Sequence, residues 1–105
     1  MNEKLQIFRT PIQELKEFRK YGETFRFVDY NEEQNTYLYE RIDDDGNVVC
    51  YEVVSPSKAK NPDGGIIEVY PSENMFGYGR AICTRSRERA ENYLKNGVFR
   101  ASVRP

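Results

Sequence analysis

The strongest constraint on the fold is a run of three strand-like segments in the first half of the chain. Residues 24–30, 36–43 and 47–54 are rich in aromatic and β-branched side chains, which favour extended structure. Asp45-Gly46 lies between the second and third segments, and this dipeptide is typical of a tight hairpin turn. The pattern predicts a central three-stranded antiparallel meander over about residues 24–54.

The register of this meander follows from the lengths of its loops. A two-residue loop at Asp45-Gly46 places Ile42 opposite Val49 and Leu38 opposite Val53, and a four-residue first loop places Phe27 opposite Leu38. A three-residue second loop would shift the pairing by one residue and divide the apolar set, so the two-residue loop is preferred. The side chains then expected on one buried face are Phe25, Phe27, Leu38, Ile42, Val49 and Val53.

A first helix is predicted over residues 11–21. Thr10-Pro11-Ile12-Gln13 reads as an N-cap threonine, a proline at the first helical position and a glutamine that completes a capping box. Apolar residues then recur at helical spacing as far as Phe18, and Gly22 follows as a stop signal.

A second helix is predicted over about residues 85–96, where Ala90 and Leu94 share a face and Asn96-Gly97 provides a stop. Short strands are expected at 4–9, 65–70, 77–83 and 98–103, with a loop at 55–65. The expected fold is one α+β domain spanning residues 1–105, in which two helices pack on a mainly antiparallel sheet.

The chain contains no histidine, which removes the commonest general base and the commonest transition-metal ligand. Serine–histidine–aspartate and cysteine–histidine catalysis are therefore excluded. We expect no catalytic residue, no metal site and no cofactor, and an enzyme is the less favoured class.

The lack of a long apolar segment bears on location, and the lack of a C-x-x-C pair bears on redox state. No segment approaches the roughly 20 apolar residues of a membrane helix, and the first residues are too polar for a signal peptide. A cytoplasmic protein without membrane contact is expected. Cys50 and Cys83 do not form a C-x-x-C pair, so they are expected to be unpaired thiols, with a disulfide or a reactive thiol as the alternatives.

Two groups of oxygen-bearing residues invite a chemical interpretation. Residues 43–47, Asp-Asp-Asp-Gly-Asn, offer oxygen ligands but lack the spacing of a calcium loop, so a solvated hairpin turn is preferred. In the predicted register Glu40 lies opposite Tyr51 on an otherwise apolar face, as a general base beside a phenol would. The structural alternative places Glu40 at the sheet rim or in a pair with a helix arginine.

Charge is divided unevenly along the chain. Residues 23–54 carry nine acids against two arginines, a net −7, whereas residues 78–105 carry seven bases against two acids, a net +5. The start of the second predicted helix is the densest basic run, and aromatic residues precede it closely. The predicted partner-binding residues are Phe76, Tyr78, Arg80, Arg85, Arg87 and Arg89.

Residues 68–94 carry a pattern of Glu68, Tyr70-Pro71-Ser72-Glu73, Phe76-Gly77 and Ala81, followed by Thr84 and a helix with Ala90 and Tyr93. This pattern resembles small uncharacterised proteins of phages and bacterial mobile elements. The resemblance covers about a quarter of the chain and implies an accessory or host-interaction setting; it implies nothing about chemistry.

Three functions remain open at this stage. The first is a small non-enzymatic binding module that acts through a protein partner, as an accessory or inhibitory protein of a phage or mobile element. The second is a nucleic-acid-binding protein that uses the basic C-terminal third. The third is a small enzyme that uses Glu40 and Tyr51.

Overall fold

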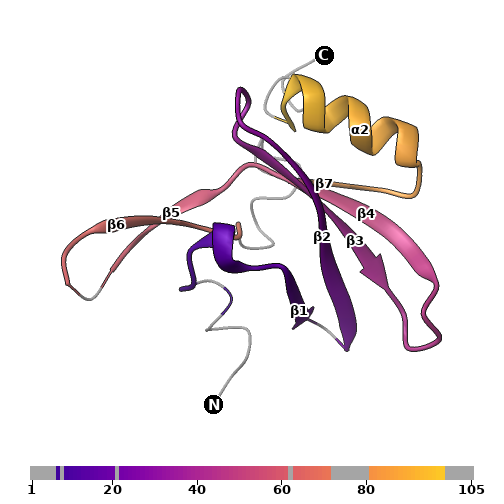
Figure 1. The fold of residues 1–105 in the computed structure, drawn as a ribbon, viewed down its shortest axis with the longest axis horizontal. Coiled ribbons are helices and arrows are strands. Elements are labelled where there is room, and N and C mark those ends of the chain that lie inside the picture. Colours follow the sequence, from indigo (N-terminus) through magenta and orange to yellow (C-terminus); the bar gives the residue numbers. More distant parts are fainter. Residues whose placement is uncertain (1–6, 8, 21, 62, 72–80, 99–105) are drawn as a thin grey trace.

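The computed structural model describes residues 7, 9–20, 22–61, 63–71 and 81–98. A five-stranded antiparallel sheet in the order β1-β2-β3-β4-β7 carries the helix α2 on one face, and β5 and β6 form a separate hairpin that extends away from it (Figure 1). The elements in chain order are η1 Ile12–Glu14, β1 Glu17–Lys20, β2 Glu23–Asn31, β3 Thr36–Ile42, β4 Val48–Val54, β5 Ser57–Lys60, β6 Ile66–Val69, β7 Ala81–Thr84 and α2 Arg87–Asn96.

The α+β class and the three-stranded meander, formed by β2, β3 and β4, are confirmed. The claim of two packed helices is wrong, because α2 is the single helix packed on the sheet among the residues described. No helix in the described part of the chain is long and apolar enough to cross a membrane.

The segment predicted as a helix over residues 11–21 forms a 3-10 turn followed by a strand. Pro11 occupies the N-cap of η1 without a side-chain cap hydrogen bond, and β1 then alternates exposed and buried residues with Phe18 and Lys20 inward. The Phe18 ring stacks on Phe25 of β2, with centroids 5.1 Å apart. An isolated helix this short is marginal in water, so strand pairing and ring contact with β2 outweigh the local capping signal.

Between β3 and β4, the hydrogen bond from Asp43 to Asn47 closes a turn of three residues, 44–46, not the two predicted. Asp43 N–H donates to the Asn47 carbonyl at 3.0 Å, and Gly46 N–H donates to the Asp43 carbonyl at 3.0 Å. Gly46 has φ +85°, the left-handed conformation that such a loop requires at its last position.

This loop shifts the pairing by one residue, and a bulge then corrects it. Ile42 pairs with Val48 instead of Val49, whereas Leu38 pairs with Val53 as predicted. The extra residue on β4 is Val49, which remains 38% exposed and so is not part of the core.

A second bulge lies in β2. Phe27 pairs with Tyr39, not with Leu38 as predicted, and after the register shift Asp29 takes the position opposite Leu38. The bulge residue Val28 packs with the helix side of the sheet, while Phe27 packs on the opposite side.

The core is divided between two faces of the sheet, contrary to the prediction of one apolar face. Side chains of β3 and β4 alternate between the faces, and both faces are covered, so consecutive residues are buried. The aromatic face comprises Phe18, Phe25, Phe27, Tyr37, Tyr39, Val54, Tyr70 and Ala81, together with Ile7, Ile12 and Leu15. The helix face comprises Leu38, Val53, Ala90, Leu94 and Val98, with Val28, Tyr51, Ile82 and Tyr93 packed around them.

The remaining elements agree with the prediction in part. β6 confirms the strand expected at 65–70, but β5 lies inside the segment expected to be a loop. The strands expected at 4–9 and 98–103, and the beginning of the one at 77–83, lie largely outside the described residues; β7 covers the end of the latter.

The helix α2 is confirmed, together with its stop signal. Ser86 is the N-cap, and its side chain accepts a hydrogen bond from Arg89 N–H at 3.1 Å. Gly97 ends the helix at φ +88°, a conformation that glycine adopts without strain.

Candidate functional site

The basic end of α2 is the candidate site, because the helix buries one side and leaves its charged side outward. Ala90 and Leu94 are buried against the sheet, in contact with β3 and β4. The exposed side chains of this segment are Arg85, Arg87, Glu88, Arg89, Glu91, Asn92, Lys95 and Asn96.

The three arginines differ in how firmly they are held. Arg87 pairs with Glu91 at 2.9 Å, lies 5.5 Å from the centre of the Tyr51 ring, and has its pKa raised above the usual value by the hydrogen bond to Glu91. Arg89 donates a long hydrogen bond of 3.4 Å to the Tyr93 hydroxyl. Arg85 and Arg89 are both exposed, and within the described residues no ion pair is seen for either.

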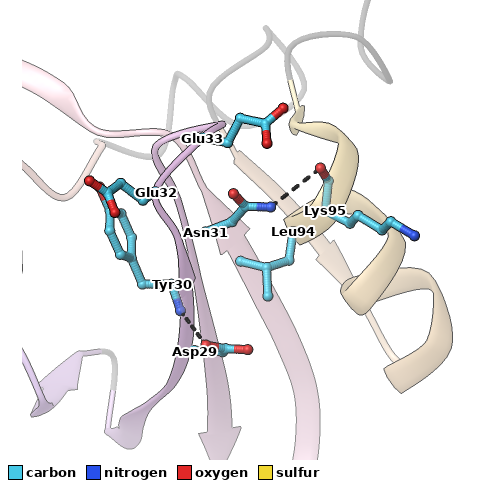
Figure 2. Close-up of a pocket in the computed structure, with 7 residues that line it drawn as sticks. All are labelled: Asp29, Tyr30, Asn31, Glu32, Glu33, Leu94 and Lys95. Atoms are coloured by element: carbon cyan, nitrogen blue, oxygen red, sulfur yellow. Dashed lines mark hydrogen bonds between the residues drawn. The ribbon is translucent and has the colours of Figure 1, made fainter.

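The other end of α2 borders an acidic hollow (Figure 2). Asn31 reaches from the end of β2 to the helix and donates to the Lys95 carbonyl at 3.4 Å, while the Lys95 side chain points away from the hollow. The hollow is lined by Asp29, Tyr30, Asn31, Glu32, Glu33, Leu94 and Lys95. The surface along α2 therefore changes from cationic at its beginning to anionic beside its end.

Of the six predicted site residues, the structure places Arg85, Arg87 and Arg89 together at the beginning of α2. Phe76, Tyr78 and Arg80 lie outside the described residues, so the candidate site consists of the three arginines.

Glu40 and Tyr51 lie opposite each other as predicted, but each is engaged elsewhere. The Glu40 carboxylate is 3.6 Å from the guanidinium of Arg26 on β2, and Tyr51 lies beneath Arg87 of the helix. Glu40 therefore pairs with an arginine, but the predicted helix arginine is wrong, because Arg26 belongs to the strand β2. This geometry gives Glu40 a role as an ion-pair partner of Arg26.

The acidic segment 43–47 forms the hairpin turn that was preferred over a cation site. The Asp43 carboxylate accepts hydrogen bonds from the backbone N–H groups of Asp45 at 3.0 Å and Asn47 at 2.9 Å. These bonds close the turn, which accounts for this residue type at the position.

A buried charged cluster on the aromatic face was missed from the sequence. The Lys20 ammonium is 3.8 Å from the Glu52 carboxylate, which also accepts a hydrogen bond from the Tyr70 hydroxyl and lies 3.8 Å from Arg41. Lys20 also lies over the rings of Phe25 and Tyr70, 4.7 and 4.5 Å from their centroids. The signal was present in the strand alternation, which turns Lys20 inward with Phe18 once residues 17–20 are read as a strand.

Three side chains of this cluster are buried in the core. Lys20 and Glu52 are each 4% exposed, and Tyr70 is completely buried. Burial, followed by the charge of Glu52, raises the pKa of Tyr70 well above its usual value, so the phenol stays protonated and donates to Glu52. Lys20, Glu52 and Tyr70 are therefore partners of one another in the interior of the aromatic face.

Cys50 and Cys83 are free thiols, as predicted. They lie on the aromatic face, on β4 and β7, with their Sγ atoms 3.1 Å apart. Burial, and then the contact with Cys50, raises the pKa of Cys83 to about 12.

Comparison of the chain with protein-family models, with curated proteins and with solved structures finds no match in any of the three.

Proposed function

We propose that the protein is a small binding module that docks a short acidic segment of a protein partner on the beginning of α2. The observation that carries this proposal is the pair of outward guanidinium groups, Arg85 and Arg89, which have no ion pair among the described residues. Cations at a helix N-terminus oppose the helix dipole, so their presence there has a small cost in helix stability. A partner carboxylate would remove that cost and gain charge-assisted hydrogen bonds.

The extent of the basic surface favours a protein over a nucleic acid. α2 has 10 residues, about 15 Å of helix, and its far end adjoins the carboxylates of Asp29, Glu32 and Glu33. A duplex lying along the helix would bring its phosphates toward these carboxylates, and the like charges would repel one another. A short acidic peptide segment ends before it meets them.

The resemblance of residues 68–94 adds a setting to this proposal. An accessory or inhibitory protein of a phage or mobile element acts by binding a host protein, and a single charged helix face is sufficient for such a contact. The partner proposed here is therefore a host protein with an exposed acidic segment.

The proposal is tested with paired charge-reversal variants. The variant Arg85→Glu/Arg89→Glu should bind a poly-glutamate peptide with an affinity at least tenfold lower, because each contact changes from attraction to repulsion. Fluorescence anisotropy at low salt measures this affinity. The matched control is Lys58→Glu/Lys60→Glu on the exposed side of β5, which makes the same charge change away from α2. Equal losses in both variants would show a general charge effect and contradict the proposed site.

A second measurement separates the two classes of partner. A random DNA duplex and a single-stranded RNA should bind the unmodified protein weakly at physiological salt. Tight duplex binding, with a steep dependence on salt that the double arginine variant abolishes, would show that the basic end of α2 serves a nucleic acid instead.

A further inference from the structure

Two thiols from different strands meet on the aromatic face without forming a bond. Cys83 pairs in register with Glu52, which is two residues from Cys50 on the same face of β4, so the two cysteines are diagonal neighbours across the β4–β7 ladder. Their Sγ atoms are 3.1 Å apart. A disulfide requires a separation of about 2.05 Å, so a movement of about 1 Å closes the gap.

We propose that Cys50 and Cys83 form a reversible oxidation site, at which a small-molecule disulfide such as oxidised glutathione closes an intramolecular bond between β4 and β7. This inference is independent of the proposed function, because it concerns the opposite face of the sheet and a different chemistry. Two features of the pair carry it, the short distance between the sulfurs and the unequal access of solvent to them.

The unequal access sets the order of the two exchange steps. Cys83 is partly accessible to solvent, whereas Cys50 is 5% exposed. The Cys83 thiolate attacks one sulfur of glutathione disulfide, and one glutathione thiolate leaves and takes up a proton. The Cys50 thiolate then attacks Cys83 Sγ and displaces the second glutathione. The two protein thiols lose two electrons and two protons, and the small disulfide is reduced to two thiols.

Strand position allows the movement that the bond requires. β7 follows β4 as the last strand in the sheet order, so within the described residues it is held by one neighbouring strand only. It also leads through Ser86 into α2, so a bond to Cys50 ties the start of the helix segment to the inner strand β4.

The environment of Cys83 makes the first step slow at neutral pH. Only the thiolate attacks a disulfide, and burial together with the Cys50 contact raises the pKa of Cys83 to about 12. The nearby Arg41 acts in the opposite direction but is the smallest of these influences. The rate of exchange should therefore rise about tenfold for each unit of pH from neutral to mildly alkaline conditions, without a plateau.

The test starts from the reduced chain incubated with oxidised glutathione at mildly alkaline pH. Samples are quenched with acid and then with N-ethylmaleimide. The expected product is a monomer two hydrogens lighter than the reduced chain, which takes up no N-ethylmaleimide and gives a peptide that joins residues 50 and 83. Its melting temperature should rise on the order of 10 °C, because the bond closes a long loop. A final product that retains glutathione, or a disulfide-linked dimer, would overturn the proposal.

Single variants test the order of the steps. Cys50→Ser should stop after the first step and accumulate one glutathione on Cys83, whereas Cys83→Ser should react at least tenfold more slowly. The reverse pattern, with rapid modification of Cys50 and none of Cys83, would contradict the proposed mechanism. Circular dichroism checks that both variants fold; if Cys50→Ser does not, quenching the unmodified protein early should trap the same Cys83 adduct.

Discussion

The two faces of the sheet are packed with different kinds of side chain. The aromatic face holds Phe18, Phe25, Tyr39 and Tyr70 with ring centroids 5.1 to 5.5 Å apart, and these rings enclose the ion pair of Lys20 with Glu52. The helix face is filled mainly by aliphatic side chains from β3, β4 and α2, with rings only at its margin. Charge is thus buried on one side of the sheet and displayed on the other.

This difference indicates which interactions stabilise each face of the sheet. Buried ions stabilise a fold little in net terms, but they have few alternative arrangements once their partners are enclosed. The aromatic face should therefore respond sharply to loss of one charged partner. On the helix face, the loss in free energy of unfolding should be proportional to the apolar volume removed. Local unfolding of α2 should also require less free energy than unfolding of the strands.

The largest effect is expected from Glu52→Ala. This change leaves the Lys20 ammonium and the Tyr70 hydroxyl buried without their shared acceptor, and should lower the free energy of unfolding by about 3–5 kcal/mol. Urea unfolding followed by circular dichroism measures it. The control is Glu40→Ala on the helix face, where the pair with a half-exposed Arg26 should cost no more than about 1 kcal/mol. Similar losses in the two variants would remove the proposed distinction between the faces.

The next effect is expected from Leu94→Ala in α2. Leu94 is buried beside Leu38 and Val53, and its truncation should cost about 2–4 kcal/mol. Hydrogen exchange should accelerate first in α2 and leave β2 and β3 protected. Ile66→Ala, at a position 63% exposed on β6, is the control and should change stability by less than about 0.5 kcal/mol. Equal acceleration in β2 and α2 would show that the two faces unfold as one unit.

The same division explains which elements could be predicted from the sequence. The meander and α2 were predicted correctly because their signals are local: β-branched and aromatic runs, Asp45-Gly46 at the turn, and Asn96-Gly97 as a stop. Residues 17–20 were assigned to a helix because nothing within that segment reveals that β2 is available to pair with it. Strand pairing is a property of the whole fold.

Register and site were harder for a related reason. The two bulges, at Val28 and Val49, each add one residue to a strand. A register predicted from loop lengths alone assumes regular pairing and therefore misses them. The arginines of α2 could be identified from charge spacing, whereas the approach of Cys50 to Cys83 depends on the pairing of β4 with β7 across 33 residues of sequence.

A smaller effect is expected from alkaline pH, and it should act through the aromatic face. Burial raises the pKa values of Tyr39 and Tyr70 in the folded protein above the usual value of 10.0. The unfolded chain loses these protons first, so stability is fully present below about pH 10 and falls as the pH rises beyond it, by about 1 kcal/mol per tyrosine at about pH 11. Urea unfolding as a function of pH measures the decline.

Tyr39→Phe sharpens this prediction. The variant loses the hydrogen bond from the Tyr39 hydroxyl to the Leu15 carbonyl, at 2.8 Å, and should be about 1 kcal/mol less stable at neutral pH. Its alkaline decline should nevertheless be shallower than that of the unmodified protein. Tyr30→Phe, at an exposed position, is the control. An unchanged slope in Tyr39→Phe would assign the alkaline loss to other groups.

The smallest effect is expected from Ser86→Ala, at the junction of β7 and α2. Ser86 caps the helix by accepting a hydrogen bond from Arg89 N–H at 3.1 Å, and its removal should cost about 1 kcal/mol. Because the cap also holds the first turn, which carries Arg89, the variant should weaken poly-glutamate binding by less than the arginine reversals do. Ser86→Asp retains an acceptor and adds a negative charge at the positive end of the helix, so it should restore stability while it lowers acidic-peptide binding further. This opposite movement of stability and binding separates the structural role of the cap from the role of the arginines. If Ser86→Asp regained both, the charge at the start of α2 would have no part in recognition.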